Sequence, residues 1–172
     1  MTWLPPPPDW IKINTDGAVR GSTGASSCGA VFRDSTGDVQ GAFSSFLGTN
    51  LTPLEAEMQG VIRAIDIASS HGLRKVWLET DSGQTVSLLK DKETEVPDFM
   101  RSDWCNMLKQ IESMEDVVVS HIYREGNTVA DKLANYGIES GDAFIAWDQA
   151  PDFILREAHL DASRHTYYRV RG

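Results

Sequence analysis

Cysteine is scarce in this sequence: its 172 residues contain two, Cys28 and Cys105. Two isolated cysteines provide neither a disulfide framework nor a cysteine-based zinc site. Disulfide-poor chains are typical of reducing compartments. We therefore expect an intracellular protein, and the sequence leaves the choice between nucleus and cytoplasm open.

Long hydrophobic runs and basic residues are also lacking. No apolar stretch approaches the ~20 residues of a membrane span, and the N-terminus lacks a signal-peptide pattern, so we expect no membrane partner. Lys and Arg number 16 against 25 Asp and Glu, for a net charge of −9. Taken alone, this charge argues against a nucleic-acid binder. It also fits a site crowded with carboxylates that metal ions neutralise.

Three segments can be separated along the chain. Residues 1–9 hold "PPPP", a stiff lead-in or linker. Residues 10–138 form the predicted domain, with strands near 10–16, 28–34, 39–48, 74–81 and 116–123. Helices are expected from Pro53 to His71, over 82–90 and 98–113, and after Asn127. Hairpins join the first three strands, and helical crossovers reach the last two, which predicts a mixed five-stranded α/β sheet with helices on both faces.

Residues 139–172 lie outside that unit and are interpreted as a C-terminal extension. Aromatic residues are expected to anchor it to the domain, namely Phe144, Trp147 and Phe153. Its terminal "RHTYYRVRG" is the only local run of positive charge. This run is either a disordered end or an auxiliary tail that binds a nucleic-acid strand.

Two carboxylates follow strands directly. Asp16 ends the first strand in "WIKINTDGA", and Asp81 ends the fourth in "RKVWLETDS". If these strands are parallel neighbours, both side chains emerge at the sheet edge where open α/β folds bind ligands. Each residue also has a local explanation, because Asp16 can form a turn with Gly17 and Asp81 can cap the next helix.

Two further acids lie on helices beside apolar stripes. Glu57 is flanked by apolar residues three before and four after it, so its helix directs it toward the sheet, whereas Glu55 completes a capping box. Asp131 stands one turn into the last helix. As alternatives, Glu57 pairs with Arg63 or Lys75 at the rim, and Asp131 is a solvated helical acid.

Four acids from four elements together favour convergence on one site. Converging carboxylates repel one another and need cations, and oxygen ligands suit Mg²⁺ or Mn²⁺ better than zinc. Two such ions can stabilise the attacking and leaving oxygens of a phosphodiester displacement. We therefore expect two Mg²⁺ ions, for which Mn²⁺ substitutes.

The motifs "NTDGA", "AEMQGVIRAI", "ETDS" and "REGNTVADKLAN" occur in this order, and over about residues 9–138 the chain resembles type 1 ribonuclease H. The opening "WLPPPPDWIKINTDGA" most resembles the RNase H-like domains of plant non-LTR retrotransposons. The resemblance implies a ribonuclease H-like fold with strand order 3-2-1-4-5. It also implies hydrolysis of the RNA strand of RNA/DNA hybrids, leaving 3′-hydroxyl and 5′-phosphate ends.

The resemblance assigns roles to individual residues. The catalytic, metal-binding carboxylates would be Asp16, Glu57, Asp81 and Asp131. Bacterial members carry a histidine in the loop before the last helix; here that loop reads "YREGN", and Arg124 is the expected catalytic substitute. The implied substrate contacts are Gly17, Ser22, Asn50, Ser82 and Asn127.

Departures from the family concern substrate binding. Ser22 stands where asparagine is common, and Asn50 is the only asparagine just before the catalytic glutamate, where the family often has two. Residues 90–103 lack the Lys-rich handle of some members. We therefore expect modest affinity for the hybrid. The expected partners are the hybrid itself and other domains of a longer polyprotein such as a reverse transcriptase, with the chain itself a monomer.

Two other functions remain open at this stage. A non-catalytic RNase H-like module that binds nucleic acid or acts as a scaffold would fit the missing asparagines and the net charge, but not the intact acids. A DEDD-type exonuclease would typically begin with an Asp-x-Glu pair on the first strand, and "NTDGA" has none.

Overall fold

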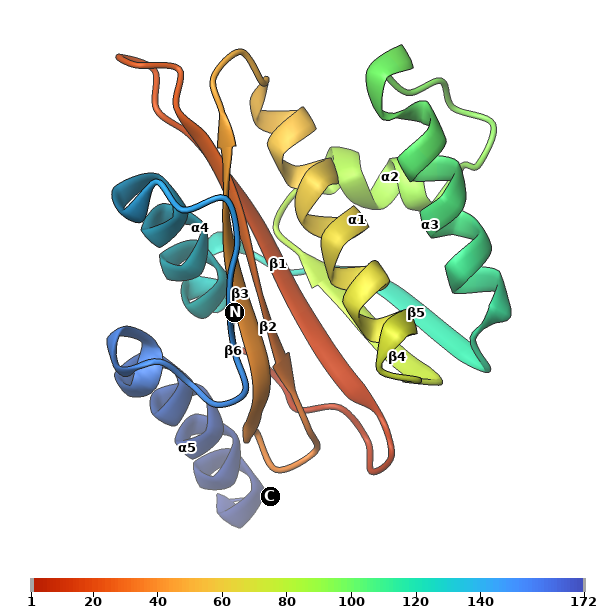
Figure 1. Cartoon of the computed structure of the whole chain (residues 1–172). Coiled ribbons are helices and arrows are strands. Elements are labelled where there is room, and N and C mark those ends of the chain that lie inside the picture. Colours follow the sequence, from red (N-terminus) through yellow and green to blue (C-terminus); the bar gives the residue numbers. More distant parts are fainter. Residues whose placement is uncertain (1, 172) are drawn as a thin grey trace.

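The described residues form a six-stranded mixed sheet between two layers of helices (Figure 1). The structure is a computed structural model that describes the backbone of residues 2–171 and the side chains of residues 2–163. Across the sheet the strands follow the order β5-β4-β1-β2-β3-β6. Their bounds are Ile11–Val19 (β1), Ser26–Arg33 (β2), Val39–Gly48 (β3), Lys75–Thr80 (β4), Asp116–His121 (β5) and Ile145–Trp147 (β6).

The pairing confirms the predicted fold class and strand order. Strands β1, β2 and β3 pair antiparallel, and β4 pairs parallel to both β1 and β5. The difference is β6, a three-residue strand that pairs antiparallel with β3 and adds a sixth strand at that edge. So short a strand offers too little alternation to be detected in a sequence.

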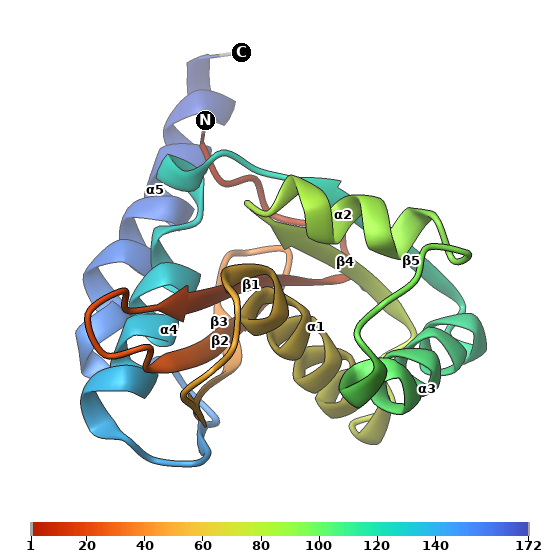
Figure 2. The ribbon, with the colours of Figure 1, turned by 90° about the horizontal axis from the view of Figure 1, so that it is seen from above.

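Helices α1 (Pro53–Ser70), α2 (Gly83–Lys90) and α3 (Arg101–Ser113) share one core with one sheet face, and α4 (Thr128–Ser140) and α5 (Leu155–Arg171) pack on the other (Figure 2). Short 3-10 turns precede α3, α4 and α5, at Asp98–Met100, Arg124–Gly126 and Asp152–Ile154. No helix within the described residues is both long and apolar enough to cross a membrane.

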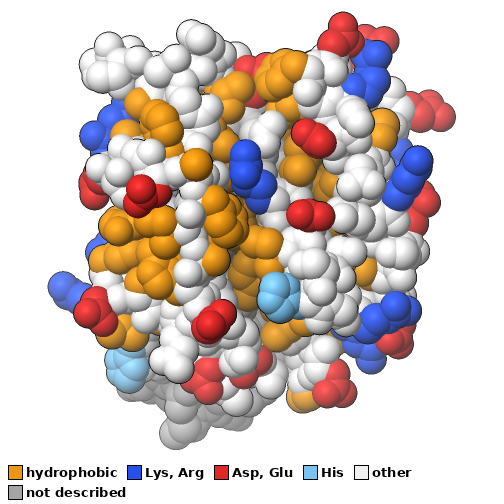
Figure 3. Space-filling view, in the orientation of Figure 1, with side chains coloured by type: hydrophobic (Ala, Val, Ile, Leu, Met, Phe, Trp, Pro, Cys, Tyr) orange, Lys and Arg blue, Asp and Glu red, His pale blue; other side chains and the backbone are white. Residues whose placement is uncertain are grey.

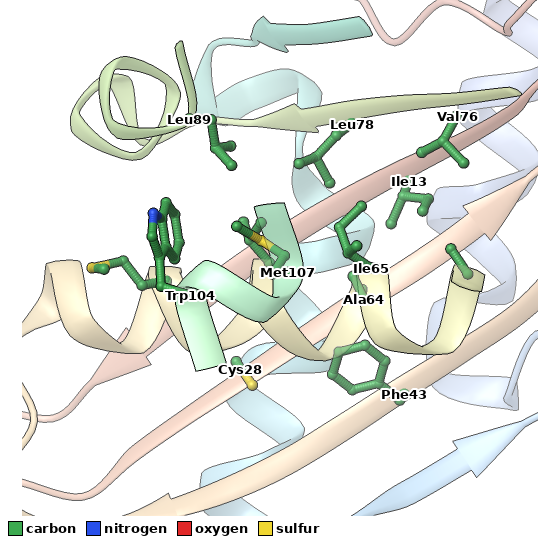
Figure 4. Packing of buried hydrophobic residues seen from close by; sticks show 14 of the residues in the cluster. Ile13, Cys28, Phe43, Ala64, Ile65, Val76, Leu78, Leu89, Trp104 and Met107 are labelled. Atoms are coloured by element: carbon green, nitrogen blue, oxygen red, sulfur yellow. The ribbon is translucent and has the colours of Figure 1, made fainter. Parts of the chain in front are cut away.

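The larger core is built around α1. One side of this helix packs against apolar side chains of β1, β3 and β4, and α3 covers another side (Figure 4). Full burial of one such side chain contributes about 1.5–3 kcal/mol. The core therefore fixes α1 against the strands whose ends carry the predicted acids. Its central members include Ile13, Phe43, Ile65, Val76, Leu78, Trp104 and Met107.

Helix α4 lies unusually close to β2 because small residues face it. A Cβ atom on Gly29 would stand 2.6 Å from the Ala134 nitrogen, and one on Gly137 would stand 2.8 Å from the Ser27 Cβ. The Ser27 hydroxyl also donates to the Ala134 carbonyl. Any larger residue at Gly29 or Gly137 would push away the helix that carries Asp131.

The C-terminal extension packs on the domain through its predicted aromatic anchors. Phe144 stacks on Phe43 of β3, with ring centroids 5.6 Å apart. Trp147 lies in β6, and its ring meets Phe153 edge-on at 5.7 Å. Tyr136 of α4 stacks on Phe153 at 4.5 Å. The extension thus continues both the sheet and the helical layer.

Candidate active site

An open cleft of about 490 Å³ lies where β1 and β4 end and where α1 and α4 begin. All four predicted carboxylates line it. The remaining lining residues are Gly17, Ala18, Val19, Pro53, Leu54, Ser82, Gln84, Arg124 and Asn135. Segments far apart in the sequence therefore meet at one polar surface.

Two of the acids lie at matching strand positions. Strands β1 and β4 are parallel neighbours, with Thr15 opposite Thr80 as their last pair, so the next residues, Asp16 and Asp81, emerge side by side. Asp81 follows β4 directly, but β1 continues to Val19 by pairing with β2, so the prediction that Asp16 ends its strand is wrong. The cap of α2 is Ser82, whose hydroxyl accepts from the Thr85 amide at 3.2 Å. Asp81 is therefore not the helix cap, and its local explanation fails.

Glu57 reaches the cleft because α1 approaches β1 closely. Thr52 and Glu55 form the predicted capping box, and Glu57 lies two residues further along the helix. A Cβ atom on Gly17 would stand 2.6 Å from the Glu57 backbone nitrogen, so only glycine permits this approach. Glu57 Oε2 is buried with no hydrogen-bond partner among the described residues, and Lys75 pairs instead with Glu115 at 3.8 Å.

Three of the carboxylates form a tight group. Ligand oxygens of Asp16, Glu57 and Asp81 all lie within 4.8 Å of one another. Asp131 lines the same cleft from α4, outside this group, and its Oδ1 accepts from Asn135 Nδ2 at 3.3 Å. Three clustered carboxylates and a fourth on the same cleft are oxygen donors of the kind that divalent cations bind.

The electrostatics of the group favour a cation. Burial raises the pKa of Asp16 far above its ordinary value, and the charges of Glu57, Asp81 and Asp131 raise it further. Burial raises the pKa of Glu57 from 4.5 to about 7. Burial also raises the pKa of Asp81, which the nearby Arg124 opposes. Without a cation the cluster retains protons that a divalent ion would displace.

Comparison with known proteins agrees with this arrangement. A family model described as reverse transcriptase-like matches residues 14–137, within which all four acids fall. The chain belongs to this ribonuclease H-like family. It is 35% identical, over 98% of its length, to an Arabidopsis thaliana protein named "Putative ribonuclease H protein". The chain spans 27% of that relative's length.

Solved structures show the same fold as this reverse transcriptase-like domain. LC11-RNase H1 in complex with an RNA/DNA hybrid is 26% identical, with a TM-score of 0.67 over 76% of this chain and 98% of that chain. The foamy viral protease-reverse transcriptase, also in complex with an RNA/DNA hybrid, is 20% identical, with a TM-score of 0.60 over 76% of this chain and 20% of that chain. The viral likeness supports the fold alone.

The other predicted site residues of the reverse transcriptase-like domain lie in different places. Gly17, Ser82 and Arg124 line the cleft, and Arg124 is exposed beside Asp81. Ser22 is exposed in the turn between β1 and β2, outside the lining of the cleft.

Two predicted substrate contacts lie away from the cleft surface. Asn50 is exposed before α1, with a left-handed φ of 75°. Asn127 is 1% exposed, and its amide donates to the Thr15 carbonyl at 3.0 Å. Asn127 therefore lies beneath the cleft, where it holds β1 rather than facing a substrate.

Two polar residues of the cleft, Asn135 and Gln84, were not predicted from the sequence. Asn135 follows Asp131 by one helical turn and donates to it, a relation that i, i+4 spacing alone could have revealed. Gln84 lines the cleft from the first turn of α2. Its position follows from the Ser82 cap, which "ETDSGQ" did not distinguish from an Asp81 cap.

Proposed function

We propose that this domain is a metal-dependent endoribonuclease that cleaves the RNA strand of RNA/DNA hybrids. The observation that carries the proposal is the group of three carboxylates within 4.8 Å at the edge of the sheet. A fourth acid and an exposed arginine border the same cleft. Further support comes from LC11-RNase H1, a related domain solved with a hybrid bound.

The residues present fit a pair of Mg²⁺ or Mn²⁺ ions. Glu57 Oε2 is a buried acceptor without a donor among the described residues, and the donor set is all oxygen. Such ions, when bound, supply the charge that activates the attacking water and stabilises the leaving oxygen. Asp16, Glu57, Asp81 and Asp131 would hold them.

The chain's own groups then orient the reaction. The Gly17 amide donates to Asp16 Oδ1 at 2.9 Å and keeps that carboxylate turned toward the cleft. Arg124 places a fixed positive charge beside Asp81, where it can bind the phosphate released at the 5′ side. Hydrolysis breaks the bond between phosphorus and the 3′ oxygen, which leaves as a hydroxyl, and water supplies the new phosphate oxygen.

The setting of the domain is part of the proposal. Because the chain spans about a quarter of its Arabidopsis relative, we propose that it works within a longer polyprotein that includes a reverse transcriptase. Both cysteines are free thiols, which fits the proposed intracellular location. We further propose that the domain acts as a monomer and that retrotransposition is its natural context.

A substrate panel tests the proposal. Labelled RNA/DNA hybrid, double-stranded RNA and single-stranded RNA are each incubated with the protein and Mg²⁺, with Asp81→Asn as the matched inactive control. Internal cleavage of the hybrid by the wild type alone would support the proposal. Stable binding of the hybrid without any product from either protein would instead establish the non-catalytic binding module, and products released only from chain ends would identify an exonuclease.

A further inference from the structure

A chain of buried hydrogen bonds connects helix α5 with the strand that carries Asp16. It lies on the sheet face opposite α1 and involves side chains of α5, β1, β2 and the N-cap of α4. None of the residues in it lines the cleft. Its members are nearly inaccessible: Asn14, Arg33, Asn127 and Asp161 are between 0% and 4% exposed.

The connection begins in the C-terminal extension. Asp161 Oδ2 accepts from Arg33 Nη1 at 2.7 Å, in an ion pair between α5 and β2. The second terminal nitrogen of the guanidinium, Nη2, donates to Asn14 Oδ1 at 3.0 Å. Arg33 thus bridges the extension and β1 with the two ends of one rigid fork.

Asn14 is fully engaged, which fixes its orientation. Its Oδ1 also accepts from Trp3 Nε1 at 2.9 Å, and its Nδ2 donates to Glu79 Oε1 at 2.8 Å and to Asn127 Oδ1 at 3.1 Å. With the Arg33 bond, these are all four hydrogen bonds that an asparagine side chain can make. A buried amide with every bond made holds its neighbours in one arrangement.

Asn127 carries the connection to the candidate active site. It is the N-cap of α4, the helix that bears Asp131, but its side chain makes no capping bond. Its Nδ2 instead donates to the carbonyl of Thr15, the residue immediately before Asp16. Asn127 therefore ties the start of the Asp131 helix to β1 immediately before Asp16.

The N-terminal lead-in packs against the same buried side chains. The Trp3 ring lies over the Arg33 guanidinium, with its centroid 4.0 Å from Arg33 Cζ. Lys12 Nζ donates to the Leu4 carbonyl at 2.7 Å and pairs with Glu79 Oε2 at 2.9 Å. The buried region therefore contains two ion pairs, Arg33 with Asp161 and Lys12 with Glu79. Their charges cancel, and all four side chains are almost inaccessible to water.

We propose that Asp161 is a positioning residue for the divalent-cation centre, acting through Arg33, Asn14 and Asn127 on the relative placement of Asp16 and Asp131. The C-terminal extension is then a working part of the active site, although it lies outside the family match at 14–137. The inference rests on the proposed function, because it assigns Asp161 to the same cation centre.

A pair of variants separates positioning from simple stability. Removing one member of a buried ion pair leaves an unpaired charge and is strongly destabilising, whereas replacing both with apolar residues is often neutral. Arg33→Met combined with Asp161→Leu therefore retains the packing while removing the bond to Asn14. The matched control is Lys132→Gln with Glu157→Gln, which removes the surface ion pair of 2.8 Å between α4 and α5.

Three measurements are made on the full chain. The first is thermal unfolding without metal. The second is calorimetric titration with Mn²⁺ in the absence of nucleic acid. The third is steady-state hydrolysis of the hybrid with Mg²⁺ varied. We expect the apolar double variant to unfold near the wild-type temperature and to bind Mn²⁺ roughly 10-fold more weakly, as for changes to the outer shell of other metal sites. The Mg²⁺ requirement should rise while KM for the hybrid stays unchanged.

Each outcome decides the inference. A double variant that folds and binds Mn²⁺ as tightly as the wild type would overturn it, as would an equal loss in the Lys132/Glu157 control. If the double variant does not fold, Arg33→Lys replaces it, because an ammonium retains the charge but lacks the fork that reaches Asn14; unchanged Mn²⁺ affinity there would also overturn the inference. A wild type that binds Mn²⁺ but cleaves no hybrid would refute the proposed function and leave the positioning role standing.

Discussion

The metal-free cluster should destabilise the fold as pH rises, and Asp16→Asn should relieve that effect. Asp16 and Glu57 have raised pKa values in the folded protein. Because the folded state then binds more protons than the unfolded state, stability is greatest below the unfolded pKa values and falls as pH rises through the folded ones. For Glu57 this window runs from 4.5 to about 7, and for Asp16 it extends higher.

The size of the effect follows from these shifts. One pKa unit corresponds to about 1.4 kcal/mol, so a rise like that of Glu57, from 4.5 to about 7, lowers the stability of the ionised folded protein by at most about 3 kcal/mol, and the larger rise of Asp16 lowers it further. Asparagine needs no proton, and its Oδ1 can still accept from the Gly17 amide as Asp16 does. Allowing for water entry into the open cleft, we expect Asp16→Asn to raise the free energy of unfolding at pH 8 by about 2 kcal/mol, or about 4–8 °C in Tm. The gain should be smaller at pH 5.

The assay is urea unfolding followed by circular dichroism, in EDTA, at pH 5 and pH 8. Asp142→Asn, at an exposed acid between α4 and β6, is the control and should change neither value. Saturating Mg²⁺ at pH 8 should reverse the order, because it stabilises the wild type and not the variant. A metal-free Asp16→Asn protein that is no more stable than the wild type at pH 8 would refute the inferred cost of burying Asp16 among the other acids.

Four further predictions follow from the site. Glu57→Gln should lose most turnover whereas Glu55→Gln keeps it, since glutamine also completes a capping box; equal behaviour in the hybrid assay would contradict the assigned helix face. Arg124→Ala should lower kcat roughly 10-fold without abolishing it, and an unchanged rate at saturating hybrid would assign Arg124 to the surface. Gly17→Ala should destabilise the fold by about 1–3 kcal/mol in urea unfolding and abolish cleavage, because the new methyl meets α1. Hybrid affinity, measured by fluorescence anisotropy, should depend only shallowly on salt; a steep dependence that survives deletion of 164–172 would reveal a basic surface elsewhere.

The salt prediction reflects the sparse positive charge. Lys and Arg side chains are scattered over the face shown in Figure 3 and form no continuous basic track. The two Mg²⁺ ions expected in the cleft would change the formal charge from −9 to −5. The side chains of the basic run at residues 164–172 lie outside the described residues, so its role as an auxiliary tail stays a prediction.

Local chemistry explains what the sequence made predictable. The sequence pattern placed Asp81 at the end of its strand and Asp16 beside it, although β1 continues to Val19, and the apolar residues around Glu57 indicated its direction on the helix. These features depend on neighbours within a few residues. The contacts that hold the cleft together were not accessible, because Asn14 meets Asn127, 113 residues away, and Arg33 meets Asp161, 128 residues away. No local pattern encodes such pairs.

The extension illustrates the same limit. Its aromatic anchors were recognisable by their apolar character, but β6 is too short to show alternation. Nothing in the sequence around Asp161 marks it as a buried residue. Its burial becomes evident only when α5 is placed against β2, where Arg33 is 1% exposed and needs an anion.

We propose that Asp16, Glu57, Asp81 and Asp131 form one divalent-cation centre that hydrolyses the RNA strand of a hybrid. Its most direct test is cleavage of a labelled RNA/DNA hybrid during Mg²⁺ titration, by the wild type and by Asp81→Asn. We expect cleavage that rises with Mg²⁺, stops in EDTA and leaves 3′-hydroxyl and 5′-phosphate ends, with the rate of Asp81→Asn reduced at least about 100-fold. Wild-type rates from Asp81→Asn, or cleavage that persists in EDTA, would contradict it.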